Sequence, residues 1–130
     1  MSKLLYQELT EKIINSFFTV YKNLGFGFLE KVYENALTHE LQVQKLYADK
    51  QRSIRVYYND NIVGDYYADI IVNDLIIIEI KAAAFLVEEH ELQLINYLKA
   101  TDKEVGLLLN FGKKPEFKRK IFTNERKTRI

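Results

Sequence analysis

The stretch from Gly64 to Lys81, GDYYADIIVNDLIIIEIK, constrains the fold most, because it sets charged residues inside sequence typical of buried strands. Residues 70–72 end a first strand, Asn73 and Asp74 supply turn chemistry, and residues 75–78 begin a second strand. The second strand is apolar on both faces, which is typical of a central strand covered on each side. It nevertheless ends in Glu79-Ile80-Lys81. The sequence therefore predicts polar side chains at the end of a buried sheet.

The register of these two strands decides which side chains meet. Side chains alternate along a strand, so Glu79 and Lys81 share one face. If residues 73–75 form the loop, Val72 pairs with Ile76, and Asp69 then lies opposite Glu79 on the same face. A shift of one residue would abolish this arrangement, and the sequence alone leaves the register open.

The rest of the chain alternates helical and strand patterns. The second predicted helix buries Val32, Tyr33, Ala36, Leu37 and Leu41. The resulting order ααβββαββ predicts an α/β fold whose mixed sheet is flanked by helices. Helices are predicted over residues 3–22, 29–45 and 88–101. Strands are predicted over residues 53–58, from the turn at 59–61 to residue 72, and over residues 75–81, 104–110 and 117–122.

Length and composition indicate one domain over residues 1–122 and a basic C-terminal tail over residues 123–130 that frays. The net charge of +1 favours no class of partner, but residues 113–129 hold eight Lys or Arg against two Glu. The chain has no cysteine, which fits the cytoplasm. The first twelve residues carry charges throughout, and no apolar run approaches membrane-spanning length, so we expect no membrane segment.

Two helices carry further polar candidates. Glu30 lies in the first turn of the helix over residues 29–45, and its neighbours at helical spacing are apolar, so we expect it to point inward. Gln93 and Tyr97 are four residues apart and share a face of the helix over residues 88–101. Structural interpretations stay open: a helix-capping Glu30, a surface polar face at Gln93, and a plain salt bridge at the strand end.

The strand-end cluster favours a metal site over a plain salt bridge. Two buried carboxylates that face each other repel unless a cation joins them. Mg²⁺ accepts carboxylate, carbonyl and water oxygens in octahedral geometry, and Mn²⁺ takes similar ligands. Asp69, Glu79 and the carbonyl of Ile80 are the predicted ligands, with Glu30 holding a metal-bound water or a second ion.

The neighbouring groups complete the equipment for metal-assisted phosphodiester hydrolysis. Lys81 shares the face of Glu79, where an ammonium orients an attacking water or stabilises charge that develops on phosphorus. Gln93 and Tyr97 are predicted to hydrogen-bond a phosphate or to position Lys81.

These residues resemble a known family. Asp69 followed by Glu79-Ile80-Lys81 is similar to the PD-(D/E)XK nuclease signature, and residues 93–97, QLINY, resemble the QxxxY element of its RecB-like branch. Residues 27–33, GFLEKVY, resemble the GxxExxY motif that names a group of small proteins in that superfamily. The likeness extends through residues 110–112. One departure is Ala68, which stands where the signature has proline; the preceding residue is not a ligand.

The resemblance implies a restriction-endonuclease-like αβββαβ core with a central mixed sheet. It also implies that Glu30, Asp69 and Glu79 are metal-site acids and that Lys81 is the catalytic lysine. By the same likeness Gln93 and Tyr97 support the active site.

Three functions follow from these observations. The first is a Mg²⁺-dependent nuclease acting on DNA, with RNA left open. The second is a nucleic-acid-binding or protein-interaction module that keeps the site for structure or regulation. The third is a metal-independent structural protein, which requires the carboxylates to lie apart.

The partners are predicted from size and charge. The chain has no room for a separate base-reading domain, which leaves structure-selective cleavage, a partner protein that supplies specificity, or a homodimer that cuts two strands. Clustered basic residues favour phosphate contacts, with a solvated terminus as the alternative. The predicted nucleic-acid-binding residues are Lys113, Lys114, Lys118, Arg119 and Lys120.

Overall fold

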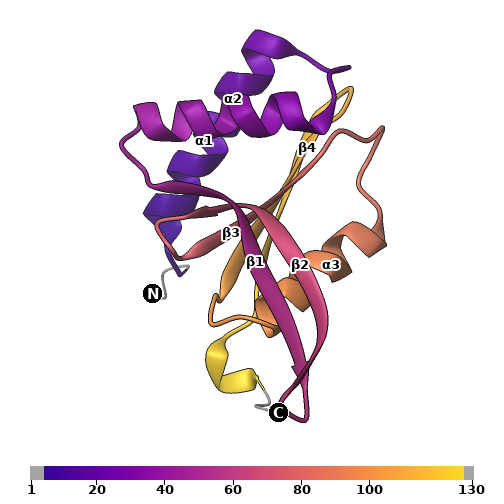
Figure 1. The fold of residues 1–130 in the computed structure, drawn as a ribbon. Helices are drawn as coiled ribbons and strands as arrows, with labels where there is room; N and C mark the ends of the chain where they lie inside the picture. The colour runs from indigo at the N-terminus through magenta and orange to yellow at the C-terminus, as the bar shows by residue number, and fades with distance from the viewer. Residues whose placement is uncertain (1–4, 128–130) are drawn as a thin grey trace.

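The computed structural model describes residues 5–127, which form a five-stranded mixed sheet with three α-helices (Figure 1). The strand order is β1-β2-β3-β4-β5; β3 and β4 are parallel, and the other neighbours are antiparallel. This is the predicted α/β, restriction-endonuclease-like architecture. The elements are α1 (Gln7–Leu24), α2 (Glu30–Val43), β1 (Ala48–Tyr58), β2 (Asn61–Val72), β3 (Ile76–Lys81), α3 (Glu88–Lys99), β4 (Val105–Phe111) and β5 (Pro115–Ile121).

The helices cover the two faces of the sheet separately. On one face, α1 and α2 pack Phe17 and Leu37 into a cluster that includes Ile78 of β3. On the other face, α3 packs Leu94 against a second cluster that includes Ile77. Consecutive isoleucines of β3 thus enter opposite clusters, so the strand is apolar on both faces because both are covered.

The sheet forks between β2 and β3. The two strands pair only at residues 70–72 of β2, although β3 continues to Lys81 beside β4. Beyond the fork, β2 stays paired with β1 in a long hairpin that extends away from the helices α1 and α2 (Figure 1). Ala68 and Ile71 both pack in the α3-side cluster although they are three positions apart, an odd spacing that places residues on opposite faces of a regular strand, so the alternation of β2 breaks between them. Asp69 lies at this break.

Three sequence expectations differ from the structure. β1 begins at Ala48 rather than at residue 53, because residues 49–52 are polar and this part of the strand pairs with β2 through its backbone, not through an alternating apolar pattern. Val32 is 39% exposed rather than buried. The chain after residue 122 is not frayed where it is described: Asn124–Arg126 forms a 3-10 turn. The last three residues of the predicted tail, 128–130, lie outside the described part.

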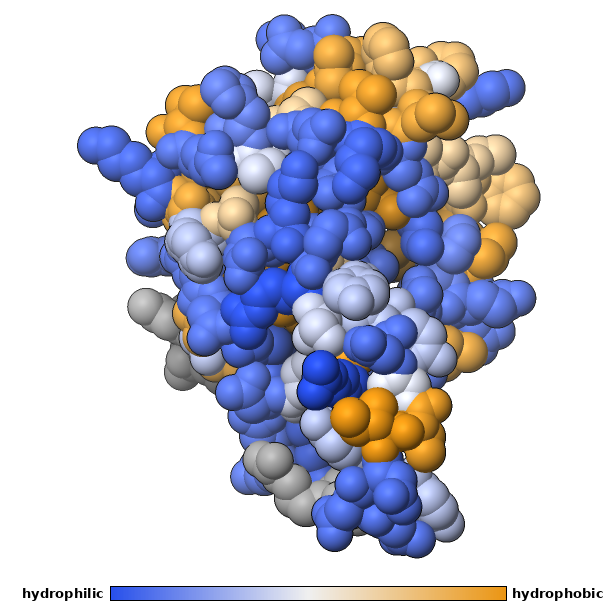
Figure 2. All heavy atoms as spheres, in the orientation of Figure 1, coloured by the Kyte–Doolittle hydropathy of each residue, from blue (hydrophilic) through white to orange (hydrophobic). Residues whose placement is uncertain are grey.

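The visible surface is largely hydrophilic, with apolar side chains gathered at the end that carries the α1–α2 connection (Figure 2). The exposed apolar residues of this connection are Phe26, Phe28 and Leu29. Within residues 5–127, no helix combines the length and apolarity that crossing a membrane requires.

Candidate active site

The β2–β3 turn sets the register that brings the acids together. Asn73 and Asp74 adopt left-handed φ values of 52° and 55°, which these residue types tolerate. The Leu75 N–H donates to the Val72 carbonyl at 2.9 Å and closes the turn. Val72 therefore pairs with Ile76, which confirms the predicted register.

Asp69 and Glu79 consequently face each other across the fork. The Asp69 N–H donates to Glu79 Oε2 at 3.0 Å, and the Ile80 N–H donates to Asp69 Oδ2 at 2.8 Å. Each carboxylate thus accepts a hydrogen bond from the backbone of the other strand, where the regular ladder ends. These two bonds hold both acids in defined positions.

The surroundings of the two acids disfavour their charged forms. Burial, and then the charge of Asp69, raise the pKa of Glu79 to about 8, and Glu79 is only 5% exposed. Burial also raises the pKa of Asp69, with smaller contributions from the charges of Glu34 and Glu30. Lys81 lowers both pKa values, but by less than burial raises them. In the metal-free site the ammonium of Lys81 therefore does not compensate for the burial that favours the protonated acids.

Lys81 is connected to α3 through a chain of hydrogen bonds. Its Nζ donates to Gln93 Oε1 at 3.4 Å, and Gln93 Nε2 donates to the Tyr97 hydroxyl at 3.1 Å. Burial, and then the charges of Glu79 and Asp69, raise the pKa of Tyr97 to about 12, so the hydroxyl keeps its proton at neutral pH. The structure thus brings the lysine, glutamine and tyrosine together at the carboxylate pair.

Glu30 lies at the open side of the site. It is the first residue of α2 and is exposed, contrary to the expected inward orientation, yet its charge raises the pKa of both Asp69 and Glu79. The buried Tyr33 fixes the entry to this helix, because its hydroxyl donates to the Gly25 carbonyl at 2.7 Å and accepts from the Phe28 N–H at 3.2 Å.

Glu34 is a buried acid that the sequence reasoning missed. It lies one turn after Glu30 and is 5% exposed. Gln51 Nε2 and Lys31 Nζ donate to its carboxylate at 3.0 and 3.1 Å. The signal was available, since a residue four positions after Glu30 lies on the same helix face.

Asn110 is a second missed residue. Its fully buried side-chain amide pairs with the backbone of Ala83, donating to the carbonyl at 3.0 Å and accepting from the N–H at 2.9 Å. Because Asn110 also pairs with Lys81 across β3 and β4, it fixes the chain directly after the lysine. A buried polar residue that ends an apolar strand was the available signal.

The predicted nucleic-acid-binding residues divide among three places. Lys113 and Lys114 are exposed in the β4–β5 turn, at the end of the sheet where Lys81 lies. On the α3 side, Lys120 pairs with Glu91 at 2.5 Å, and Lys118 lowers the pKa of the same glutamate. On the opposite side, the Arg119 guanidinium donates to the Leu5 carbonyl at 2.5 Å. Arg119 and Lys120 are therefore occupied by contacts within the protein.

The donor set fits a hard divalent cation that keeps several waters. Within residues 5–127, no group of three or more His, Cys, Asp or Glu lies close enough to hold a metal ion, so a cation here relies chiefly on Asp69 and Glu79. Mg²⁺ commonly binds through one or two carboxylates with water and substrate oxygens completing its shell. The Ile80 side chain lies in the core, and its carbonyl stays a predicted ligand.

Comparison with known proteins agrees with this arrangement. A family model described as the PD-(D/E)XK nuclease superfamily matches residues 7–120, from the start of α1 almost to the end of β5. No curated protein and no solved structure matches the chain. The matched residues include the whole fork and every candidate side chain from α2, β2, β3 and α3. The chain therefore belongs to the PD-(D/E)XK nuclease superfamily.

Proposed function

We propose that this protein is a metal-dependent nuclease of the GxxExxY group that hydrolyses phosphodiester bonds in DNA with Mg²⁺, or with Mn²⁺ in its place. One observation carries the proposal: Asp69 and Glu79 face each other at the fork, beside a lysine held by Gln93. Opposed carboxylates suit the binding of a catalytic cation, and a positioned ammonium suits stabilisation of the charge that develops during hydrolysis.

The acids serve to bind the cation. When bound, the ion supplies Lewis-acid polarisation of the phosphate and a water of lowered pKa. Asp69 and Glu79 hold it, with the Ile80 carbonyl as a further ligand. Glu30, at the exposed side of the site, holds a water or a second ion. The raised pKa values of Glu79 and the partly buried Asp69 support this assignment, because a bound cation stabilises the charged forms that burial disfavours.

Lys81 and its partners serve the transition state. The ammonium donates a hydrogen bond to the attacking water or to the phosphate oxygens as negative charge develops there. Gln93 fixes the position of the ammonium, and Tyr97 fixes Gln93. A group held in place before the reaction begins costs less reorganisation at the moment of reaction.

The phosphate backbone of DNA has basic partners at the same end of the sheet. Lys113 and Lys114 are exposed there and supply sequence-independent contacts. Lys118 adds a third contact, and Arg119 and Lys120 contribute on release from their internal partners. Target choice falls to DNA structure, to a partner protein or to a homodimer.

The test is single-turnover cleavage of a labelled duplex, a single strand and a branched substrate in Mg²⁺ and in Mn²⁺. Lys81→Ala is expected to lower the rate on the order of 10²–10³-fold while binding in Ca²⁺ stays near that of the wild type. Lys81→Arg is expected not to restore the rate, because a planar guanidinium does not replace a compact ammonium. Lys12→Ala, at an exposed position of α1, is the matched control.

Binding of every substrate without cleavage would contradict the nuclease and favour the non-catalytic binding module. In that module Lys81 is one phosphate contact among several. Lys81→Arg would then be silent, and Lys81→Ala would lower only the affinity and its salt dependence.

A further inference from the structure

A groove of about 1050 Å³ lies between α3 and the β1–β2 hairpin, and the proposed chemistry uses only one edge of it. The β-bulge at Val56 and Tyr57 helps to shape the hairpin wall, since both residues line the groove. The residues that line the groove include Tyr57, Tyr66, Gln93, Tyr97, Phe122 and Arg126.

The hairpin wall of the groove presents exposed aromatic rings. Tyr57 is 47% exposed and Tyr66 is 49% exposed, so about half of each large and mainly apolar side chain contacts solvent. The Tyr66 ring lies 5.7 Å from the ring of Tyr97, measured between centroids. Partly exposed aromatic rings that line a groove suit a flat ligand that stacks on them.

Cationic groups also line the groove. The Arg126 guanidinium lies 4.4 Å from the centre of the Phe122 ring, and the Lys99 ammonium lies 5.4 Å from it. Two acids also line the groove, but Asp102 is paired with Lys103 at 3.0 Å, which leaves Glu89 at the rim. Positive charge therefore exceeds negative charge in the groove, which suits an anionic ligand.

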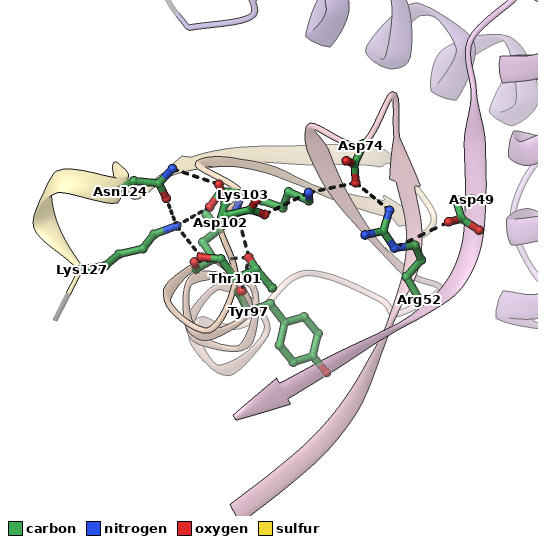
Figure 3. Close-up of polar contacts among 10 residues, drawn as sticks. Asp49, Arg52, Asp74, Tyr97, Thr101, Asp102, Lys103, Asn124 and Lys127 are labelled. Carbon is green, nitrogen blue, oxygen red and sulfur yellow. Dashed lines mark hydrogen bonds and ion pairs between the residues drawn. The ribbon is translucent and has the colours of Figure 1, made fainter. Parts of the chain in front are cut away.

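The wall that carries Arg126 is fixed by hydrogen bonds (Figure 3). Lys127 Nζ donates to the carbonyls of Thr101 and Lys103 at 2.8 and 2.6 Å. It also donates to the Asn124 side chain, whose own amide donates to the Asp102 carbonyl at 3.1 Å. These hydrogen bonds hold the C-terminal turn against the end of α3. The groove is therefore preformed, and binding a ligand requires less ordering of the protein.

The groove leads directly to the candidate active site. Gln93 and Tyr97 line it, and Gln93 also contacts Lys81. A chain that lies along the groove therefore reaches the carboxylate pair from the α3 side.

We propose that this groove binds an unpaired nucleic-acid strand, with bases stacked on Tyr57 and Tyr66 and phosphates near Lys99 and Arg126. The inference rests on the proposed function and specifies its substrate class. Stacking requires bases whose faces are open, which a continuous duplex does not offer. The volume is slightly above the usual range for small-molecule pockets and suits a short stretch of strand.

The hairpin supplies matched variants for the test. Tyr57 and Tyr66 each have a neighbouring tyrosine, Tyr58 and Tyr67, which is 60% and 53% exposed but does not line the groove. Binding is measured by fluorescence anisotropy in Ca²⁺ with a labelled oligothymidylate, an oligouridylate and a blunt duplex. The first two probes separate DNA from RNA. Single strands that contain 2-aminopurine report stacking directly through quenching.

The wild type is expected to bind a single strand more tightly than the blunt duplex and to quench 2-aminopurine. Tyr57→Ala and Tyr66→Ala are each expected to weaken single-strand binding roughly tenfold, as loss of one stacked base does. Tyr58→Ala and Tyr67→Ala are expected to leave it unchanged. Tyr66→Phe keeps the ring and is expected to bind as the wild type, which separates stacking from loss of folding.

Two results would overturn the inference without contradicting the proposed nuclease activity. In the first, the protein cleaves DNA, but substitutions of the groove tyrosines and of the control tyrosines weaken single-strand binding equally. In the second, the protein cleaves DNA but binds the duplex more tightly than the single strand. Binding that depends on Tyr57 and Tyr66 but is accompanied by no cleavage in Mg²⁺ or Mn²⁺ would contradict the nuclease and support the groove. Absence of binding to every probe would overturn both.

Discussion

Glu79 is a carboxylic acid in a strand of isoleucines, and its environment favours the neutral form. Burial, followed by the charge of Asp69, raises its pKa from about 4.5 to about 8. An acid with a raised pKa in the folded state holds its proton in a pH range where the unfolded chain has released it. The free energy of unfolding therefore falls as the pH rises across that range.

The stability of the metal-free protein is expected to fall as the pH rises from about 4.5 to about 8. Glu79 contributes at most about 1.4 kcal/mol per pH unit. Glu79→Gln is expected to reduce this slope and not to abolish it, because the pKa of Asp69 is raised as well. The measurement is urea unfolding in a chelator at several pH values.

Glu91→Gln is the control for this experiment. Its hydrogen bond with Lys120 lowers the pKa of Glu91, so the stability that it contributes is present above about 4.5 and is lost only as the pH falls. Between pH 5 and 9 this substitution should therefore change the free energy of unfolding by a similar amount at every pH. A slope unaltered by Glu79→Gln would show that Glu79 is charged in the folded protein.

Tyr33 offers a second prediction at the scale of one residue. Its hydroxyl satisfies the Gly25 carbonyl and the Phe28 N–H, while its ring stacks on Phe111 with centroids 4.2 Å apart. Tyr33→Phe keeps the stacking but removes both hydrogen bonds, so a loss of about 1–3 kcal/mol is expected. Chemical denaturation measures it, with Tyr47→Phe at a position 63% exposed as the control. Equal effects would contradict the role of the hydroxyl.

At the scale of elements, the β2–β3 hairpin was predictable because its turn chemistry and its apolar run agree. The sequence left the register open; in the structure Asn73 and Asp74 form the turn, and the resulting register places Asp69 opposite Glu79. The break in alternation beside Asp69 was not predictable, because it depends on Gln51 of the neighbouring strand, which adopts a left-handed φ of 56°. Such a distortion arises from pairing between strands, not from a local pattern.

The orientation of α2 shows the same limit. Helical spacing placed Glu30 beside apolar residues, but it could not show that the first turn of α2 stays exposed. Glu30 is exposed there, and the buried acid is Glu34. The basic residues of β5 were likewise read as one group, whereas neighbours on a strand point to opposite faces. Lys120 consequently meets Glu91, and Arg119 meets Leu5.

The close approach of β4 to its neighbours gives an element-scale prediction. A Cβ on Gly112 would lie 2.4 Å from the Ala83 carbonyl oxygen, and one on Gly106 would lie 2.6 Å from Leu94 Cδ1. A side-chain end can rotate, but a backbone carbonyl held by Asn110 cannot move alone. Gly112→Ala is therefore expected to destabilise more than Gly106→Ala, whose overpacking costs roughly 1–3 kcal/mol. Paired urea unfolding experiments measure this difference, and the reverse order would contradict it.

At the scale of the whole molecule, the candidate site lies where parts with separate cores converge. α2 brings Glu30 from the core on one face of the sheet, and α3 brings Gln93 from the other face. The hairpin contributes Asp69, and β3 contributes Glu79 and Lys81. A ligand at this junction contacts only the folded arrangement, so binding there stabilises the entire fold.

Mg²⁺ is therefore expected to raise the unfolding temperature of the wild type. An ion that binds only the folded state adds about 2.7 kcal/mol at a concentration one hundred times its dissociation constant. Asp69→Asn and Glu79→Gln each remove the charge of one metal ligand, so Mg²⁺ should raise the unfolding temperature of both variants much less. In chelator both variants should be at least as stable as the wild type, because the substitution relieves repulsion between the two acids. Glu91→Gln lies outside the fork and should gain as much as the wild type. Thermal unfolding with chelator, Mg²⁺ and Mn²⁺ compares the four proteins. Equal gains in all four would mean that the ion binds elsewhere, and the carboxylate pair would then be a structural feature of the fork, not a metal site.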